Sequence, residues 1–319
     1  MPSLKEIYEF SIKEGVKEDP RGEEEIKRLL VEAKERYSEL KGYQKEYFDR
    51  ERLQNPFADS LILNGEDAKN IEAVAVGIDI ESQEMLLVDR LKQKGTKIDA
   101  IITHHPEGRA LAALHQVMDM QIRILHKAGV PISQAEAVVR PRVDEVRRGL
   151  HPFNHTRAID AARLLGIPFM SMHTVADNHV HMFLQKLLEK EKPRTIKNLV
   201  DILYKIPEYQ WAASHGMGPT IFTGSPENEC GKITFDMTGG TELDKSRMKV
   251  MAESGINTIV AMHMSKDQYE EAKSHNINVV AAGHMSSDSL GMNLVLDKLD
   301  KKFKLKIVEI SGFKRVKRN

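Results

Sequence analysis

Short apolar runs alternate with amphipathic stretches along most of the chain. Residues 73–78 and 98–103 form two such runs, and residues 85–94 between them have the spacing of an amphipathic helix. Another run covers residues 167–172, and the alternation resumes near the C-terminus. This pattern is typical of β-α-β units, in which helices cover both faces of a mainly parallel sheet. We therefore expect an α/β fold.

The N-terminal part of the chain has a different pattern. Residues 22–50 are rich in Glu, Lys and Arg, and apolar residues recur there in steps of three and four. That spacing predicts one amphipathic helix whose apolar stripe packs on another part of the protein. The stripe consists of Ile26, Leu29, Leu30, Ala33, Tyr37 and Leu40. Turn-forming residues between positions 52 and 65 then indicate a linker.

Proline and glycine mark a second change of pattern. They are frequent between residues 190 and 240, which indicates a boundary with an irregular connecting region. We predict a helical arm and linker over residues 1–60, a first α/β domain over residues 61–190 and a second α/β domain over residues 191–319.

Four of the predicted strands are each followed by a histidine. Three related segments run from a helix end through a strand into His104, His263 and His284, and the strand at 167–172 ends at His173. Four such placements are improbable by chance, because only 13 of the 319 residues are histidine. Ligands of open α/β sheets bind at the carboxyl ends of the strands, so these imidazoles are expected near one site. For His173 and His263, a hydrogen bond to a loop carbonyl group explains the residue equally well.

Two of these segments contain further ligand-type residues. His104 and His105 are adjacent where a strand ends, so that each could bind a different ion of a close pair. Asp288 lies four residues after His284, a separation that a helical turn brings onto one face. The alternative is that Asp288 stabilises the first turn of the helix that follows.

The segment after His173 repeats this chemistry. Asp177 lies four residues after His173, although it could instead be the N-cap of a helix over residues 179–188. Imidazole and carboxylate groups without a thiolate indicate a mixed nitrogen and oxygen site. Zinc, iron, manganese, cobalt and nickel all suit such a site.

In this order, the segments 101–106, 173–177 and 282–288 resemble the NIF-three-like family of dinuclear metal proteins, whose members are often described as GTP cyclohydrolase type-two-like. The resemblance covers about residues 66–312. It implies two related α/β domains with two divalent metal ions between them, in a ring-shaped homo-oligomer that is commonly a hexamer. The metal ligands that it implies are His104, His105, Asp177, His284 and Asp288.

The chain departs from this family in two respects. The family usually has Glu where Asp288 stands, so the carboxylate here is one methylene shorter and could bind one metal instead of bridging two. The N-terminal arm and much of the segment 190–240 also lie outside the familiar pattern. The first departure bears on the metal site, and the arm and the segment 190–240 bear on the substrate.

Composition excludes several other classes of protein. Lys plus Arg and Asp plus Glu both number 47, so no net charge favours nucleic acid or acidic lipid as a partner. The single cysteine, Cys230, rules out an internal disulfide and a multi-cysteine zinc site. The chain has no apolar run of about 20 residues and no basic-then-apolar start, so we expect no membrane association and a cytoplasmic location.

The sequence leaves three functional hypotheses. In the first, the protein is a metal-dependent hydrolase or cyclohydrolase in which His263 and His173 transfer protons. The resemblance suggests a nucleotide-like or phosphorylated small molecule as its substrate. In the second, the protein stores or delivers metal ions in an oligomeric shell without turnover. In the third, it is a metal-free interaction module in which the histidines are incidental.

Overall fold

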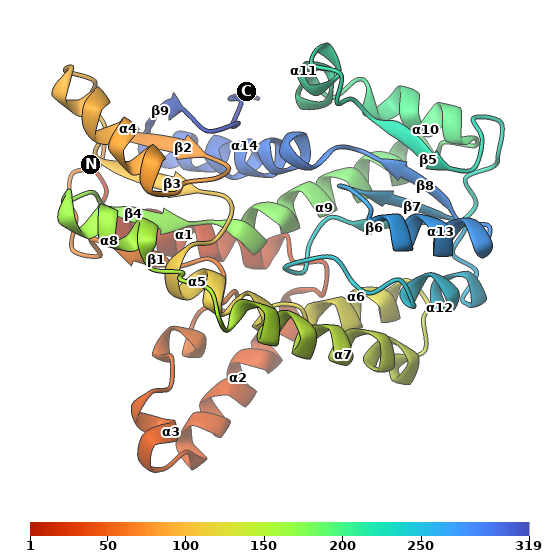
Figure 1. The fold of residues 1–319 in the computed structure, drawn as a ribbon, viewed down its shortest axis with the longest axis horizontal. Coiled ribbons are helices and arrows are strands. Elements are labelled where there is room, and N and C mark those ends of the chain that lie inside the picture. The colour runs from red at the N-terminus through yellow and green to blue at the C-terminus, as the bar shows by residue number, and fades with distance from the viewer. Residues whose placement is uncertain (319) are drawn as a thin grey trace.

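The computed structural model describes residues 1–318, and they form two mixed, mainly parallel β-sheets with helices on both faces (Figure 1). The expected α/β fold is therefore confirmed. The first sheet has the order β1 (Ile62–Asn64), β4 (Phe169–Ser171), β3 (Ala100–Thr103), β2 (Ala73–Gly77) and β9 (Lys306–Glu309). The second has the order β5 (Thr220–Thr223), β8 (Asn278–Ala281), β7 (Thr258–Ala261) and β6 (Ile233–Asp236). Only the edge strands β1 and β5 are antiparallel to their neighbours.

Alternating side chains place a hydrophobic cluster on each face of the first sheet. Val74 and Val76 of β2 face the cluster that contains α1 (Leu4–Lys17), α9 (His173–Glu191) and α14 (His284–Phe303). Ala75 between them faces α4 (Ser82–Gln93) and α8 (Arg157–Leu164). Because every residue of β2 is buried, its run of small apolar side chains suits a strand that is covered on both sides.

The second sheet is covered in the same way. One face packs on α10 (Ile196–Leu203), α11 (Pro207–Ser214) and parts of α9 and α14. The other face packs on α6 (Met120–Lys127), α7 (Ile132–Leu150), α12 (Arg247–Glu253) and α13 (Lys266–Ser274). Helices α9 and α14 therefore contribute to the cores of both halves, and Figure 1 shows them lying side by side between the two sheets.

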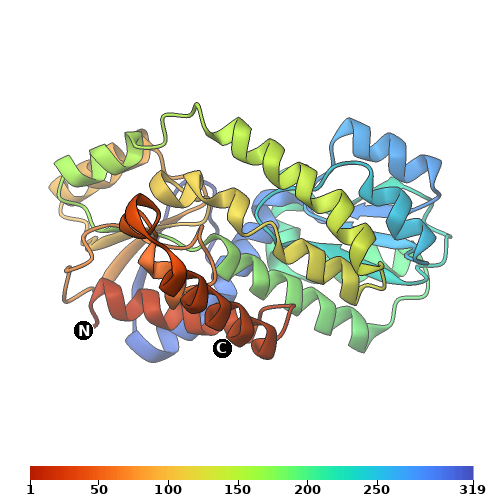
Figure 2. The same cartoon turned by 90° about the horizontal axis from the view of Figure 1, so that it is seen from below.

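Each half also contains elements from the residue range that was predicted for the other half. Helices α6 and α7 lie within the range 61–190 but pack on the second sheet, and Figure 2 shows α7 running across to that half. Strand β9 lies within the range 191–319 but pairs with β2 of the first sheet. The division into those two ranges stays a prediction, and the two sheets do not follow it at these elements.

The N-terminal arm differs from the single helix that was expected. It contains α1, α2 (Glu23–Glu39), α3 (Gly42–Glu46) and the 3-10 turn η1 (Arg50–Leu53). A capping box between Ser3 and Glu6 begins α1, which is part of the first core. Helices α2 and α3 project from the body (Figure 1), and within the expected apolar stripe only Ile26 is buried. The remaining stripe residues are half-buried because no sheet lies beneath them.

The segment 190–240 is more regular than its proline content indicates. It contains α10, α11, β5 and β6, because the prolines lie at helix starts and in loops. Two short elements, α5 (Gly108–Ala112) and η2 (Leu114–Gln116), lead from the first sheet to α6. Among the helices of residues 1–318, none has the length and hydropathy needed to cross a membrane.

Candidate metal centre

The candidate ligands are positioned by strand ends of both sheets. His104 and His105 follow β3, and their backbone N–H groups donate to the carbonyl oxygens of Gly77 and Ile78 at the end of β2. His284 begins α14 three residues after β8, because Gly283 takes a positive φ of 108° and redirects the chain. The structure brings three of the four strand-end histidines, His104, His173 and His284, together with His105 in overlapping groups.

The two carboxylates project from the first turns of long helices. Helix α9 begins at His173, so Asp177 lies one turn later on the same face. The alternative in which Asp177 caps a helix over residues 179–188 is therefore wrong. Helix α14 begins at His284, so Asp288 is likewise one turn into its helix.

Asp288 lies at the centre of the cluster. Its Oδ1 is 3.3 Å from Nε2 of His104, and its Oδ2 is 3.5 Å from Nε2 of both His105 and His284. The second carboxylate, Asp177, has Oδ1 at 3.4 Å from Nε2 of His104. The two acids therefore face the same imidazole from different helices.

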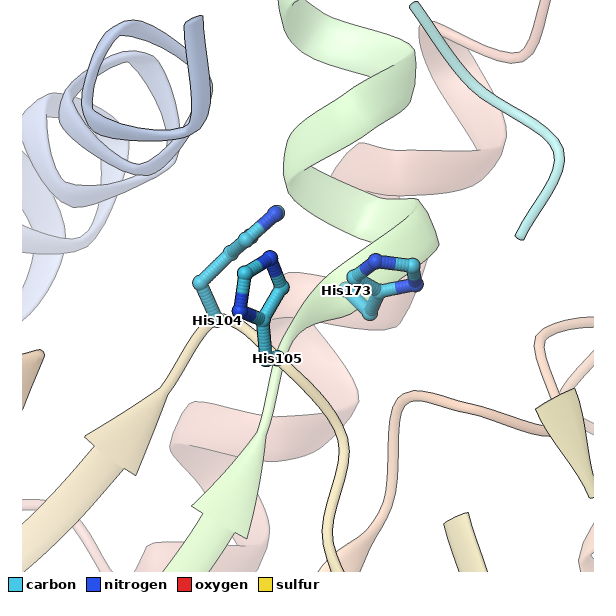
Figure 3. Close-up of side chains that lie close together, drawn as sticks. All are labelled: His104, His105 and His173. Carbon is cyan, nitrogen blue, oxygen red and sulfur yellow. The ribbon is translucent and has the colours of Figure 1, made fainter. Parts of the chain in front are cut away.

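Three overlapping groups of these side chains have the spacing of metal ligands. In each group, one ligand atom per residue lies within 4.8 Å of the others. The groups are His104, His105 and His173; His105, His284 and Asp288; and His104, Asp177 and Asp288. Figure 3 shows the first group, with His104 and His105 at the end of β3 and His173 at the start of α9.

Buried atoms without hydrogen-bond partners show that the cluster fits a cation. The Asp288 side chain is fully buried, and neither of its oxygens has a hydrogen-bond partner among the described residues. Asp177 Oδ1 and His104 Nδ1 are also buried without a partner there. Burying carboxylate oxygens without donors is costly, and a divalent cation removes that cost. The donor set of imidazole nitrogen and carboxylate oxygen suits such an ion.

The pKa values of the metal-free cluster follow from burial and mutual contact. Burial lowers the pKa of His104 to about 4. Burial also acts to lower the pKa of His105, but contacts with Asp288 and Asp79 outweigh it and raise that pKa to about 10. Burial raises the pKa of Asp177 to about 8. Asp288 is equally buried, yet the neighbouring histidines hold its pKa far below the usual range.

Two further carboxylates fix the orientation of the imidazoles. His105 Nδ1 is 2.6 Å from Asp79 Oδ1, and His173 Nδ1 is 2.8 Å from Asp59 Oδ2. Because a carboxylate accepts the Nδ1–H proton, the Nε2 lone pair of each ring is left free to bind a metal. Thr174 Oγ1 also donates to Asp59 at 2.6 Å. The sequence analysis did not identify Asp59 or Asp79.

The two histidines proposed for proton transfer occupy different positions. His173 is buried and belongs to one of the ligand groups, so it can bind a metal as well as carry a proton. His263 lies in none of the three groups, although its ring centroid is 4.8 Å from that of His284. Its side chain is 48% exposed, and its Nδ1 is 3.6 Å from Oε2 of Glu242.

A cavity of about 340 Å³ opens onto the cluster. Its lining residues follow the carboxyl ends of β3, β4, β6, β7 and β8, so both sheets contribute to it. The loop after β6 supplies Thr238, Thr241 and Glu242. Glu107, which follows β3 of the first sheet, also lines the cavity, and burial raises its pKa to about 7. A small molecule therefore has access to the candidate ligands.

Comparison with solved structures decides the fold. A NIF3 superfamily protein from Sphaerobacter thermophilus superposes with a TM-score of 0.70 and 24% sequence identity, over 80% of this chain and 92% of that chain. The present chain has a NIF3-like fold. Reduced HcgD from Methanocaldococcus jannaschii superposes with a TM-score of 0.51 and 14% identity, over 78% of this chain and 87% of that chain. No family model matches the sequence, and no curated protein is similar to it.

The resemblance found in the sequence is thus confirmed at the level of the fold. In this NIF3-like fold, the segments that carry the resemblance are the end of β3 and the starts of α9 and α14. These segments bring together all five residues that it implied as ligands: His104, His105, Asp177, His284 and Asp288. The grouping of histidine and aspartate fits a metal-binding protein.

Proposed function

We propose that the protein is a metal-dependent hydrolase with two divalent cations bound by His104, His105, Asp177, His284 and Asp288. The observation that carries this proposal is the buried Asp288 carboxylate, which lies against three imidazoles and whose oxygens have no hydrogen-bond partner within residues 1–318. Divalent cations bound there supply Lewis acidity, which lowers the pKa of water and polarises a substrate oxygen.

His263 is the residue best placed to move protons in this reaction. It lines the cavity, is half exposed and has Glu242 beside its Nδ1. A neutral imidazole that lines the cavity can accept a proton through one of its ring nitrogens. In hydrolysis, the water oxygen bonds to the substrate centre, His263 takes the water proton, and the leaving group receives a proton as its bond breaks. His173 is the second candidate for this role.

The same geometry gives partial support to a second function, the storage or delivery of metal ions. The His284 side chain is 41% exposed and that of His105 is 27% exposed. Ligands that solvent can reach allow metal to exchange with the surroundings. The homohexamer, the cytoplasmic location and the nucleotide-like or phosphorylated substrate stay predictions.

Turnover by three variants tests the hydrolase proposal. Metal-loaded protein is assayed on cyclic amides, esters, phosphoesters and nucleotides. His104→Ala should lose both metal and turnover. His263→Ala should keep its metal and lose about 10²–10⁴-fold in turnover, the usual contribution of an acid–base group. His151→Ala, an exposed histidine outside the cluster, is the control and should change neither property.

Two outcomes contradict the proposal. One is a protein that binds two metal ions but turns over none of these substrates and exchanges its metal readily, which favours storage or delivery. The other is turnover that survives in His104→Ala, because hydrolysis would then be independent of the cluster.

A further inference from the structure

A second cavity, of about 510 Å³, adjoins the candidate metal centre. It lies between the end of α11, the loop that follows it, β5 and the start of α14. We call it the Trp211 cavity, after the single tryptophan of the chain, which lines it. Among the described residues, it shares Met262, His263 and His284 with the cavity at the candidate metal centre.

The Trp211 cavity is apolar and collects exposed hydrophobic side chains. Met217 is 74% exposed, Phe222 is 40% exposed and Met285 is 36% exposed, and all three line it. None of its described lining residues is Asp, Glu, Lys or Arg. Apolar surface held open to water in this way is costly, at about 25 cal/mol per Å². A concave apolar surface of this size is typical of a small-molecule site.

The cavity shares a wall with the metal-centre cavity. Met262, His263 and His284 line both. His284 contributes a ligand atom to the metal cluster, and His263 is the proposed proton carrier. The two cavities are therefore adjacent, and the Trp211 cavity lies beside any molecule whose polar end binds at the cluster.

The absence of cationic side chains from the described lining of both cavities limits the class of substrate that they can bind. No lysine or arginine is among the described residues that line either cavity. Phosphate groups are usually bound by such side chains or by helix N-termini. Apart from the cations themselves and the start of α14, the two cavities therefore offer little to a highly anionic substrate, and none of the described residues that line the Trp211 cavity is an Asp, Glu, Lys or Arg.

We propose that the Trp211 cavity is the specificity pocket of the enzyme and holds an uncharged apolar substituent, aryl or branched alkyl, of a substrate whose scissile group lies at the metal centre. This inference rests on the proposed hydrolase function and gives it a substrate class, that of apolar-substituted amides or esters. The three lining residues that it shares with the metal-centre cavity favour a substrate group over a second copy of the chain as the occupant.

Two hydroxamates that differ only in their apolar part test this assignment. Acetohydroxamate and benzohydroxamate share one metal-binding group, so their relative affinity reports the pocket. Benzohydroxamate should bind metal-loaded protein at least about tenfold more tightly, because it buries a phenyl ring. It should also change the fluorescence of Trp211, the only tryptophan in the chain, whereas acetohydroxamate should not.

Met217→Asp and Leu164→Asp form a matched pair of variants. Both residues are exposed, at 74% and 75%, but only Met217 lines the cavity. Met217→Asp should reduce the preference for benzohydroxamate to less than about threefold, since the charge makes the pocket polar. Leu164→Asp should keep the full preference. The metal content of both variants should equal that of the original protein.

Equal affinity for the two hydroxamates, or a preference that persists in Met217→Asp, would overturn the assignment. So would a fall in oligomeric mass in Met217→Asp without any hydroxamate preference in the original protein, because a second copy would then cover the surface. Benzyl alcohol, which has no metal-binding group, tests the pocket in metal-free protein independently of the hydrolase proposal. It should change Trp211 fluorescence in Leu164→Asp but not in Met217→Asp. If it does so while neither hydroxamate binds metal-loaded protein, the proposed metal centre is wrong and the apolar pocket is retained.

Discussion

Among the described residues of the cluster, Asp288 is the one whose burial most needs compensation by nearby positive charge. Its carboxylate is fully buried, and imidazole nitrogens of His104, His105 and His284 lie 3.3–3.5 Å from its oxygens. If these rings bind metal through Nε2, they cannot also donate hydrogen bonds from that atom. The charge of Asp288 is then balanced by the cations, so the residue is suited to a ligand role and poorly suited to a purely structural one.

Protons held by the metal-free cluster predict that metal binding depends on pH. At pH 7, below the pKa values of about 8 for Asp177 and about 10 for His105, the Asp177 carboxyl group is protonated and His105 is an imidazolium with protons on both ring nitrogens. Each group must lose one proton to act as a metal ligand. Metal binding at pH 7 should therefore release protons, and affinity should rise as pH increases toward 8 and beyond.

Calorimetric titrations of metal into the protein, in buffers of different ionisation enthalpy, measure this release. Asp177→Asn should release about one proton fewer, because the amide has none to lose. Binding that releases no protons at pH 7, with an affinity that is constant between pH 6 and pH 9, would show that these two residues are not ligands.

The residues of the cluster differ in how far the sequence could reveal them. His104 and His105 follow β3 directly and His284 lies three residues after β8, so local pattern predicts their place at the edge of a sheet. Asp79 has a similar signal, because it follows β2 by two residues, but it was not recognised. Asp59 has none, since only the folded chain brings it to His173, which is 114 residues away.

At the scale of elements, the spacing of α9 and α14 sets the spacing of the ligands. A Cβ atom on Gly291 of α14 would lie 2.4 Å from the carbonyl oxygen of Ala176 in α9. Ala176 precedes Asp177, and Gly291 lies one turn after Asp288. The glycine thus allows the close approach that places both carboxylates beside His104.

Gly291→Ala is expected to separate these helices. The added methyl group meets backbone, which cannot move aside as a flexible side chain would, so stability should fall by about 1–3 kcal/mol. Metal affinity should fall as well, because Asp177 moves away from Asp288. Gly149→Ala is the control, since Gly149 lies in α7 with no atom within 4 Å of the added Cβ atom, and it should leave stability unchanged or raise it by about 0.5–1 kcal/mol. Denaturant unfolding and metal titration of both variants provide the measurements, and equal behaviour of the two would refute the packing argument.

Local sequence predicted the strands better than the start of α9. The residues after His173 include Thr174 and Val175, whose β-branched side chains have low helix propensity and favour a loop reading. Both are fully buried against the core, and burial outweighs the small propensity difference. The helix therefore begins six residues earlier than residue 179, and this brings Asp177 onto the same face as His173.

At the scale of the whole molecule, the two halves exchange elements around the cavity. Helices α6 and α7 pack on the second sheet, although the strands before and after them in the chain belong to the first, and β9 returns to the first sheet from the far end. A division of the chain into consecutive residue ranges assigns such helices to the wrong sheet. Hydrophobic periodicity shows that a helix has a buried face, but it does not show which sheet covers that face.

This arrangement makes the centre a property of the complete fold. The first sheet supplies His104 and His105, helix α9 supplies Asp177, and helix α14, which follows the second sheet, supplies His284 and Asp288. Neither half contains the full set. Metal bound by all five residues would therefore hold the two halves together.

The most direct test is the metal content of untagged protein, combined with anomalous diffraction from its crystals. We expect two divalent cations per chain, bonded to His104, His105, Asp177, His284 and Asp288, and a loss of metal in Asp288→Asn. Protein that binds no divalent metal, or binds it only away from these five side chains, would rule out a dinuclear centre at this site.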